Sequence, residues 1–216
     1  MQEFEKHSFY HVVLEAMRGR GCAVCRLVAQ ASHRYLDSIL YEAVNTEEFR
    51  AKFRAARGFC PRHARETCTF ASALGTTILY REVLADALAR WEAVAAKGSA
   101  VKPAKGKCPA CQVEEGVVAN FIETVYGHIG DAQFVEAYRA SEGLCVGHFE
   151  AVLAKVPSRV RRVLVDMERE KMSVLIGRLD EFVRKCDYRF AQEPKGDEGH
   201  AWADAIRKSA GGAEKK

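Results

Sequence analysis

Residues 58–63 read GFCPRH and residues 143–148 read GLCVGH, so the pattern Gly-apolar-Cys-x-x-His occurs twice in the chain. A Cys-x-x-Cys pair, at residues 22–25 and 108–111, precedes each copy. Residues 48–63 (EFRAKFRAARGFCPRH) align with residues 133–148 (QFVEAYRASEGLCVGH) at a shift of 85 positions, 133 minus 48. The two halves of the chain are therefore diverged copies of one repeat.

The alignment serves as an internal control on the eight Cys and seven His residues of the chain. It matches eight of them between the halves, at the positions of a four-ligand set. The seven without a match are His7, His11, His33, Cys68, His128, Cys186 and His200. A shared chemical role explains this selective agreement better than chance composition does.

The matched residues have the spacing of zinc ligands, because structural zinc takes four tetrahedral ligands, usually as two close pairs from separate segments. We assign one set to each repeat and expect two zinc ions per chain. The sets are Cys22, Cys25, Cys60 and His63 in the first repeat, and Cys108, Cys111, Cys145 and His148 in the second. Pairing of the Cys-x-x-Cys of one half with the Cys-x-x-His of the other is an open alternative.

Each ligand pair is predicted to begin a helix. Proline suits the first helical position, so Pro61 makes Cys60 the N-cap and His63 the third helical residue. Side chains at these two positions converge, as they do in a capping box. A helix N-terminus also favours the net negative charge of a site with three thiolates and one imidazole.

Helical periodicity dominates the chain, and no alternating strand pattern is present, so we predict an all-α protein. Each repeat should contain a long helix, a shorter returning helix and a third helix that begins at Cys-x-x-His, held together by a Cys3His site. The predicted division is a first repeat at 1–97, a linker at 98–107, a second repeat at 108–190, and a short helix and tail at 191–216.

The same periodicity predicts which side chains are buried. One expected buried face consists of Tyr80, Val83, Leu84, Ala87, Leu88 and Trp91. Trp202 and Ile206, four residues apart, are expected to dock a terminal helix onto the body. Cys68 and Cys186 are expected to be small buried side chains.

Composition excludes several classes of protein. The chain has 216 residues, 48% of them hydrophobic, but no apolar run of the length that a membrane helix needs. Its first residues carry charges where a signal peptide would be apolar, so we expect a cytoplasmic protein. A net charge of +4 is too small and too dispersed to favour nucleic acid as a partner. An unidentified protein partner is compatible with these features.

Two other chemistries fit the same ligands. Three cysteines and a histidine can hold an iron–sulfur cluster, although such clusters usually take four cysteines. Cys-x-x-Cys at a helix start is also a thiol–disulfide redox arrangement, but its usual βαβ context is missing. A closed four-ligand site leaves no position for substrate or water, so a structural metal in a scaffold or interaction protein is favoured over an enzyme.

The segments SFYHVVLEAMRGRGCAVCRL, RYLDSILYEAVN, RGFCPRH, KCPAC, GLCVGH and RKCDYRF together resemble a bacterial family known only as a domain of unknown function. The resemblance covers most of the chain, from about residue 8 to about residue 207. In that family proline is expected at the position of Ala23, and often histidine at that of Cys186. Neither departure removes a matched ligand, but Ala23 weakens the predicted N-cap at Cys22. The resemblance implies a helical protein and no established activity.

Overall fold

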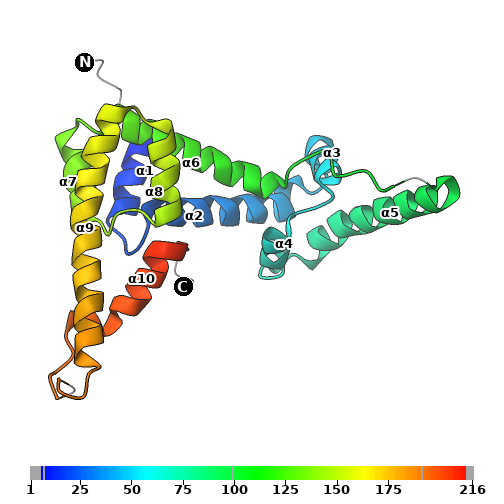
Figure 1. The fold of residues 1–216 in the computed structure, drawn as a ribbon. Helices are drawn as coiled ribbons and strands as arrows, with labels where there is room; N and C mark the ends of the chain where they lie inside the picture. Colours follow the sequence, from blue (N-terminus) through cyan, green and yellow to red (C-terminus); the bar gives the residue numbers. More distant parts are fainter. Residues whose placement is uncertain (1–5, 7, 99, 191, 213–216) are drawn as a thin grey trace. The chain divides into compact units, whose positions relative to one another are not determined.

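A computed structural model describes residues 6, 8–98, 100–190 and 192–212, and every regular element within them is a helix (Figure 1). The predicted all-α class is confirmed. The elements of the first half are α1 (Ser8–Met17), α2 (Ala23–Ser38), the π-helical turn η1 (Ile39–Ala43), α3 (Glu47–Ala56), α4 (Pro61–Thr67) and α5 (Ala73–Lys97). Those of the second half are α6 (Pro109–His128), α7 (Ala132–Ala140), α8 (Val146–Lys155), α9 (Ser158–Lys185), the 3-10 helix η2 (Asp197–His200) and α10 (Ala201–Ala210).

The order of helices is the same in the two halves. A long helix (α2 or α6) is followed by a shorter one (α3 or α7) and by a helix that begins at Cys-x-x-His (α4 or α8). The third helix is short in both halves, 7 and 10 residues, and a fourth helix of 25 or 28 residues follows it. The prediction of three helices per repeat thus missed the break before α5 and α9.

The segment between the halves is non-helical where it is described. Ser99, which belongs to the predicted linker, lies outside the described residues, as do residues 213–216 of the predicted tail. The amides of Lys105 and Gly106 both donate to the carbonyl of Ala55, at 3.1 and 3.0 Å. This part of the segment is therefore held against the end of α3.

The chain forms two compact units that differ from the sequence repeats. The discontinuous unit contains Met1–Ala29 and Val117–Lys216, and the continuous unit contains Gln30–Gly116. Each of α2 and α6 contributes residues to both units. The boundaries at 1–97 and 108–190 stay a prediction about the repeat, because the compact units divide the chain in another way.

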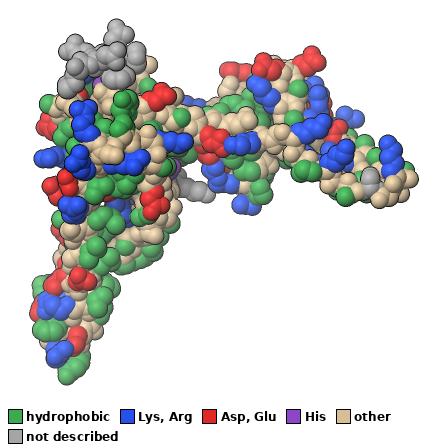
Figure 2. Space-filling view, turned by 45° about the horizontal axis from the view of Figure 1, so that its top comes forward, with side chains coloured by type: hydrophobic (Ala, Val, Ile, Leu, Met, Phe, Trp, Pro, Cys, Tyr) green, Lys and Arg blue, Asp and Glu red, His purple; other side chains and the backbone are tan. Residues whose placement is uncertain are grey.

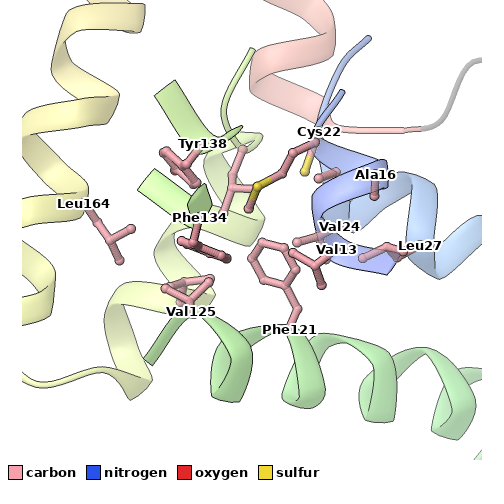
Figure 3. Close-up of a cluster of buried hydrophobic side chains, with 14 of the residues drawn as sticks. Val13, Ala16, Cys22, Val24, Leu27, Phe121, Val125, Phe134, Tyr138 and Leu164 are labelled. Atoms are coloured by element: carbon pink, nitrogen blue, oxygen red, sulfur yellow. The ribbon is translucent and has the colours of Figure 1, made fainter. Parts of the chain in front are cut away.

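The core of the discontinuous unit joins the inner faces of α1, α2, α6, α7 and α9 (Figure 3). Its labelled members include Val13, Val24, Phe121, Phe134 and Leu164, which are fully or almost fully buried. Cys22 lies in the same cluster, so the first ligand of the chain is positioned by core packing.

The core of the continuous unit combines aliphatic side chains with three buried phenylalanines, Phe49, Phe53 and Phe59. Phe53 is fully buried and packs edge-to-face on Phe59, with ring centroids 4.8 Å apart. Gly75 lets α5 approach η1 closely, because a Cβ there would lie 2.3 Å from the carbonyl oxygen of Leu40. Ser72 strengthens the same contact by donating to that oxygen at 3.1 Å.

Two predicted buried faces are only partly buried. Tyr80 and Val83 of α5 pack against the core, and α10 contacts α9, as expected, but the largest side chains of both faces are exposed. Leu84, Leu88 and Trp91 of α5 are 66%, 54% and 60% exposed, because α5 packs through Gly75 and Leu79 on another side. On α10 the buried contact is Ala201, while Trp202 and Ile206 point outward. Figure 2 shows hydrophobic side chains on the surface over α9 and α10. Among the described helices, none combines the length and the apolar character needed to cross a membrane.

Candidate metal centres

The eight matched Cys and His side chains form two groups of four, and within each group the ligand atoms lie within 4.8 Å of one another. We call them the outer and inner centres, because the residues of the first bracket those of the second in sequence. The outer centre is Cys22, Cys25, Cys145 and His148, and the inner centre is Cys60, His63, Cys108 and Cys111.

The pairing within each repeat was therefore wrong, and the structure pairs the ligands across the halves. Each centre takes Cys-x-x-Cys from one half and Cys-x-x-His from the other. The spacing shows that each pair is half of a site, but identical half-sites carry no information about which two meet. Each centre lies wholly in one compact unit, the outer in the discontinuous and the inner in the continuous unit.

All four ligand pairs stand at helix starts, as predicted. Cys60 and Cys145 are the N-caps of α4 and α8, with extended backbone at φ −64°, ψ 163° and φ −67°, ψ 158°. In these pairs the cysteine Sγ lies 3.4 Å (Cys60–His63) and 3.2 Å (Cys145–His148) from the histidine Nδ1. Cys22 directly precedes α2 although Ala23 replaces the proline, so proline is not required for this helix start.

In each group, the distances between the ligand atoms fit one bound ion. The sulfurs of Cys60 and Cys111 are 3.7 Å apart, as are those of Cys25 and Cys145. The distances from histidine Nδ1 to sulfur range from 3.2 Å, at Cys145, to 3.6 Å, at Cys22. A tetrahedron with zinc–sulfur bonds of 2.3 Å has an edge of about 3.8 Å. The arrangement thus has the size of one tetrahedral coordination sphere.

The inner centre has a carboxylate behind its histidine. His63 is fully buried, and its Nε2 lies 3.1 Å from Oε1 of Glu114, while Nδ1 faces the sulfurs. Arg62 donates to both oxygens of Glu114. Burial opposes ionisation of Glu114, but the hydrogen bonds from Arg62 and His63 outweigh it and lower its pKa. Such a carboxylate fixes the orientation and tautomer of a metal-binding histidine.

Repeat alignment did not find Glu114, because its counterpart is Val28. A weaker signal was present: Glu114 stands three residues after Cys111 on α6, so the two share a helix face.

The start of α4 also lowers the pKa of one candidate ligand, Cys60. Burial raises the pKa of the Cys60 thiol, but the backbone amides of His63 and Arg62 and the Cys111 side chain outweigh it and lower the pKa to about 7. A low thiol pKa favours the thiolate that metal coordination requires.

The outer centre is covered by the end of α10 and the two glycines after it, which we call the C-terminal clasp (α10, Gly211 and Gly212). The amide of Gly212 donates to Cys25 Sγ at 3.2 Å. Gly211 has φ +71°, and a Cβ there would lie 3.1 Å from Cys145 Sγ and 3.2 Å from Cys25 Sγ. Lys208 anchors the clasp. Its Nζ donates hydrogen bonds to the buried carboxylate of Glu168 and, at 3.0 Å, to the carbonyl of Glu142. All three outer sulfurs are buried.

A cavity of about 380 Å³ adjoins the outer centre, and Cys22 and Cys145 form part of its wall. Its basic side chains are engaged within the protein: Arg178 pairs with Asp204 at 2.9 Å, and Lys171 donates to the carbonyls of Arg139 and Ser141.

The cysteines outside the centres are not buried as expected. Cys68 and Cys186 are both exposed, so the prediction of small buried side chains was wrong. Cys68 follows the last residue of α4 and Cys186 that of α9, where the chain leaves the helix at the surface. Two unmatched histidines have packing partners: His33 stacks on Phe70 and His128 lies against Tyr10.

Comparison with known proteins gives a family. The chain is 27% identical over 202 residues to the "uncharacterized 23.9 kDa protein in xynA 3'region" of Caldicellulosiruptor sp. (strain Rt8B.4), covering 92% of this chain and 99% of the relative. No solved structure matches the chain. The model of a family of unknown function, DUF6062, matches residues 6–84 and 81–216, which together span almost the whole chain. The protein therefore belongs to the DUF6062 family.

Proposed function

We propose that this protein is a zinc-binding helical scaffold or interaction protein, with one ion in each Cys3His centre. The observation that carries the proposal is that two complete ligand sets, each assembled from distant segments, have the dimensions of a single tetrahedral ion. Residues brought together only by packing would not be expected to converge twice in this way.

The same dimensions support zinc over an iron–sulfur cluster. A cluster contains two or more irons bridged by sulfide, so ligands on different irons stand farther apart than the ligands of one ion. Here the sulfurs of Cys25 and Cys145, which come from different segments, are 3.7 Å apart. The donor set of three thiolates and one imidazole is common for structural zinc.

A closed ligand set supports a structural role for the metal. Catalytic zinc keeps one position for water or substrate, whereas each centre here supplies four protein ligands. The ion in the outer centre would tie the start of α2 to the start of α8, and that in the inner centre would tie α4 to α6. Structural zinc in small modules contributes on the order of 10 to 16 kcal/mol to folding.

Metal analysis of the purified protein, together with its visible spectrum, tests the proposal. We expect two zinc ions per chain and no colour. Iron together with broad visible absorbance would contradict zinc and indicate iron–sulfur clusters at the same ligands. Failure to bind any metal after anaerobic purification would overturn both and favour thiol–disulfide exchange.

A further inference from the structure

Helix α5 carries an exposed stripe on the side opposite its packing contacts, and the stripe is apolar from Leu84 to Ala95. The exposed positions recur at alternating steps of four and three, the spacing of a coiled-coil seam. They are Thr77, Arg81, Leu84, Leu88, Trp91 and Ala95. The other side of α5 is occupied by its own unit: Leu79 is fully buried, and Glu82 pairs with Arg50 and Arg54.

The stripe has one charge near each end. Arg81 stands before the leucines, and Glu92 follows Trp91 on the same flank. Unlike Glu82, neither forms an ion pair with another residue in the described part of the chain. A partner that presents an acidic group at one end of the stripe and a basic group at the other would complement both.

We propose that this partner is α5 of a second copy of the chain, packed antiparallel to form a homodimer. Antiparallel seams place alternate seam positions level with each other. With the centre at Asp86, Leu84 of one copy lies level with Leu88 of the other. Arg81 then lies level with the ring of the other copy's Trp91 and within one residue of its Glu92, so ion-pair and cation–π contacts form twice.

The parallel arrangement is disfavoured by the same residues. It would set Arg81 against Arg81 and Glu92 against Glu92, and like charges at matched positions repel. Ala85, on the flank of the seam near the proposed centre, is small enough to let two helices approach. The sequence of α5 is thus self-complementary in the antiparallel direction only.

The seam from Thr77 to Ala95 is about 27 Å long at 1.5 Å per residue. A single helix pair of this length buries less than the roughly 1,600 Å² of a standard interface, so the dimer should dissociate on dilution. The inference rests on the proposed function, because it identifies the partner of this proposed interaction protein as a second copy of the chain.

Sedimentation equilibrium of the full, metal-loaded chain over a wide concentration range tests this dimer. The wild type should approach twice the 24.0 kDa chain mass as concentration rises. Leu88→Glu should abolish the dimer. Val183→Glu is the matched control, because Val183 is an apolar side chain that is 70% exposed but lies on α9, away from the seam of α5.

Charge reversal identifies the register. Arg81→Glu and Glu92→Arg should each weaken dimerisation roughly three- to tenfold, and the double variant should restore it, because the pairs re-form with opposite polarity. A monomer at all concentrations, or no recovery in the double variant, would overturn the proposal. Metal content measured on the same samples separates the outcomes: a monomer with two zinc ions refutes only the dimer, and a dimer without metal refutes only the zinc centres.

Discussion

The backbone amide of Gly212 donates a hydrogen bond to Cys25 Sγ, joining residues 187 positions apart in sequence. The residue before it, Gly211, has positive φ, and a Cβ added there would lie 3.1 Å from Cys145 Sγ and 3.2 Å from Cys25 Sγ. The outer centre is therefore closed by a third segment in addition to its two ligand pairs, whereas the inner centre is supported by Glu114.

The clasp should slow the loss of metal from the outer centre. Gly211→Ala adds a Cβ in tight contact with two sulfurs, at 3.1 and 3.2 Å, and at a φ that alanine rarely adopts, so the clasp should be displaced. We expect release of one of the two ions to a chelator to become on the order of tenfold faster. Gly98→Ala is the control, because Gly98 also has positive φ but open space around it.

A second measurement does not depend on bound metal. In the metal-free protein, iodoacetamide should modify Cys25 faster in Gly211→Ala than in the wild type, as mass spectrometry would show. Equal rates of both metal release and modification would contradict a protective clasp.

Paired cysteine substitutions distinguish the observed grouping from pairing within repeats. Cys25→Ser with Cys145→Ser removes two ligands of one centre and should cost one metal ion, while Cys25→Ser with Cys60→Ser should cost both. Metal content per chain is the measurement. Pairing within repeats predicts the opposite result. The Cys25→Ser, Cys60→Ser double variant would then lose one ion, and the Cys25→Ser, Cys145→Ser double variant would lose two.

Glu114 should stabilise the inner ion through His63. Glu114→Gln keeps the size of the side chain but loses the charge that orients the imidazole, so the affinity of one of the two sites should fall roughly 10- to 100-fold. Competition with a chelator measures both sites in one sample, and the outer site is the internal control. Loss of affinity at both sites would indicate general destabilisation instead.

Two tyrosines, the partly buried Tyr35 and the fully buried Tyr138, should make the protein sensitive to alkali. Burial raises the pKa of Tyr35 to about 12, and burial together with the nearby Glu168 raises the pKa of Tyr138 well above its usual value. Because the folded state holds these protons more tightly, their contribution to stability is complete below the ordinary tyrosine pKa of about 10 and is lost as pH rises towards the folded values.

The free energy of unfolding should therefore fall above about pH 10, with late tyrosinate absorbance appearing together with loss of helix. Tyr35→Phe should reduce this alkaline loss. Ionisation of all seven tyrosines in one step, with the helices intact, would be the contrary result.

The ligands were predictable from the sequence because duplication marks them: His63 and His148 match, while His33 and His128 have no counterpart. Their grouping was not predictable, since any Cys-x-x-Cys can complete any Cys-x-x-His. The supports of the centres were missed for a related reason. Glu114 and Gly212 are recognised only by their contacts in the folded protein, with His63 and with Cys25. The repeat gives no signal for Glu114, because the alignment pairs it with Val28.

The exposed face of α5 shows another limit. Periodicity reports that Leu84, Leu88 and Trp91 share one side of a helix, and it is equally strong whether that side packs within the chain or against another molecule. The anchoring of α5 through Gly75 depends instead on a close backbone approach to Leu40. Hydrophobic spacing contains no signal for such a contact.

The ligand order has a consequence for how the chain is made. All four inner ligands have been synthesised once Cys111 is complete, whereas the outer centre waits for His148 and its cover for Gly212. If the centres bind zinc as proposed, the ligands of the inner ion are available while the ribosome is still adding most of the second half. The ligands of the outer centre are complete only after those of the inner centre. A chain interrupted between Cys111 and Cys145 would therefore carry one full ligand set and leave the thiols of Cys22 and Cys25 without their partners.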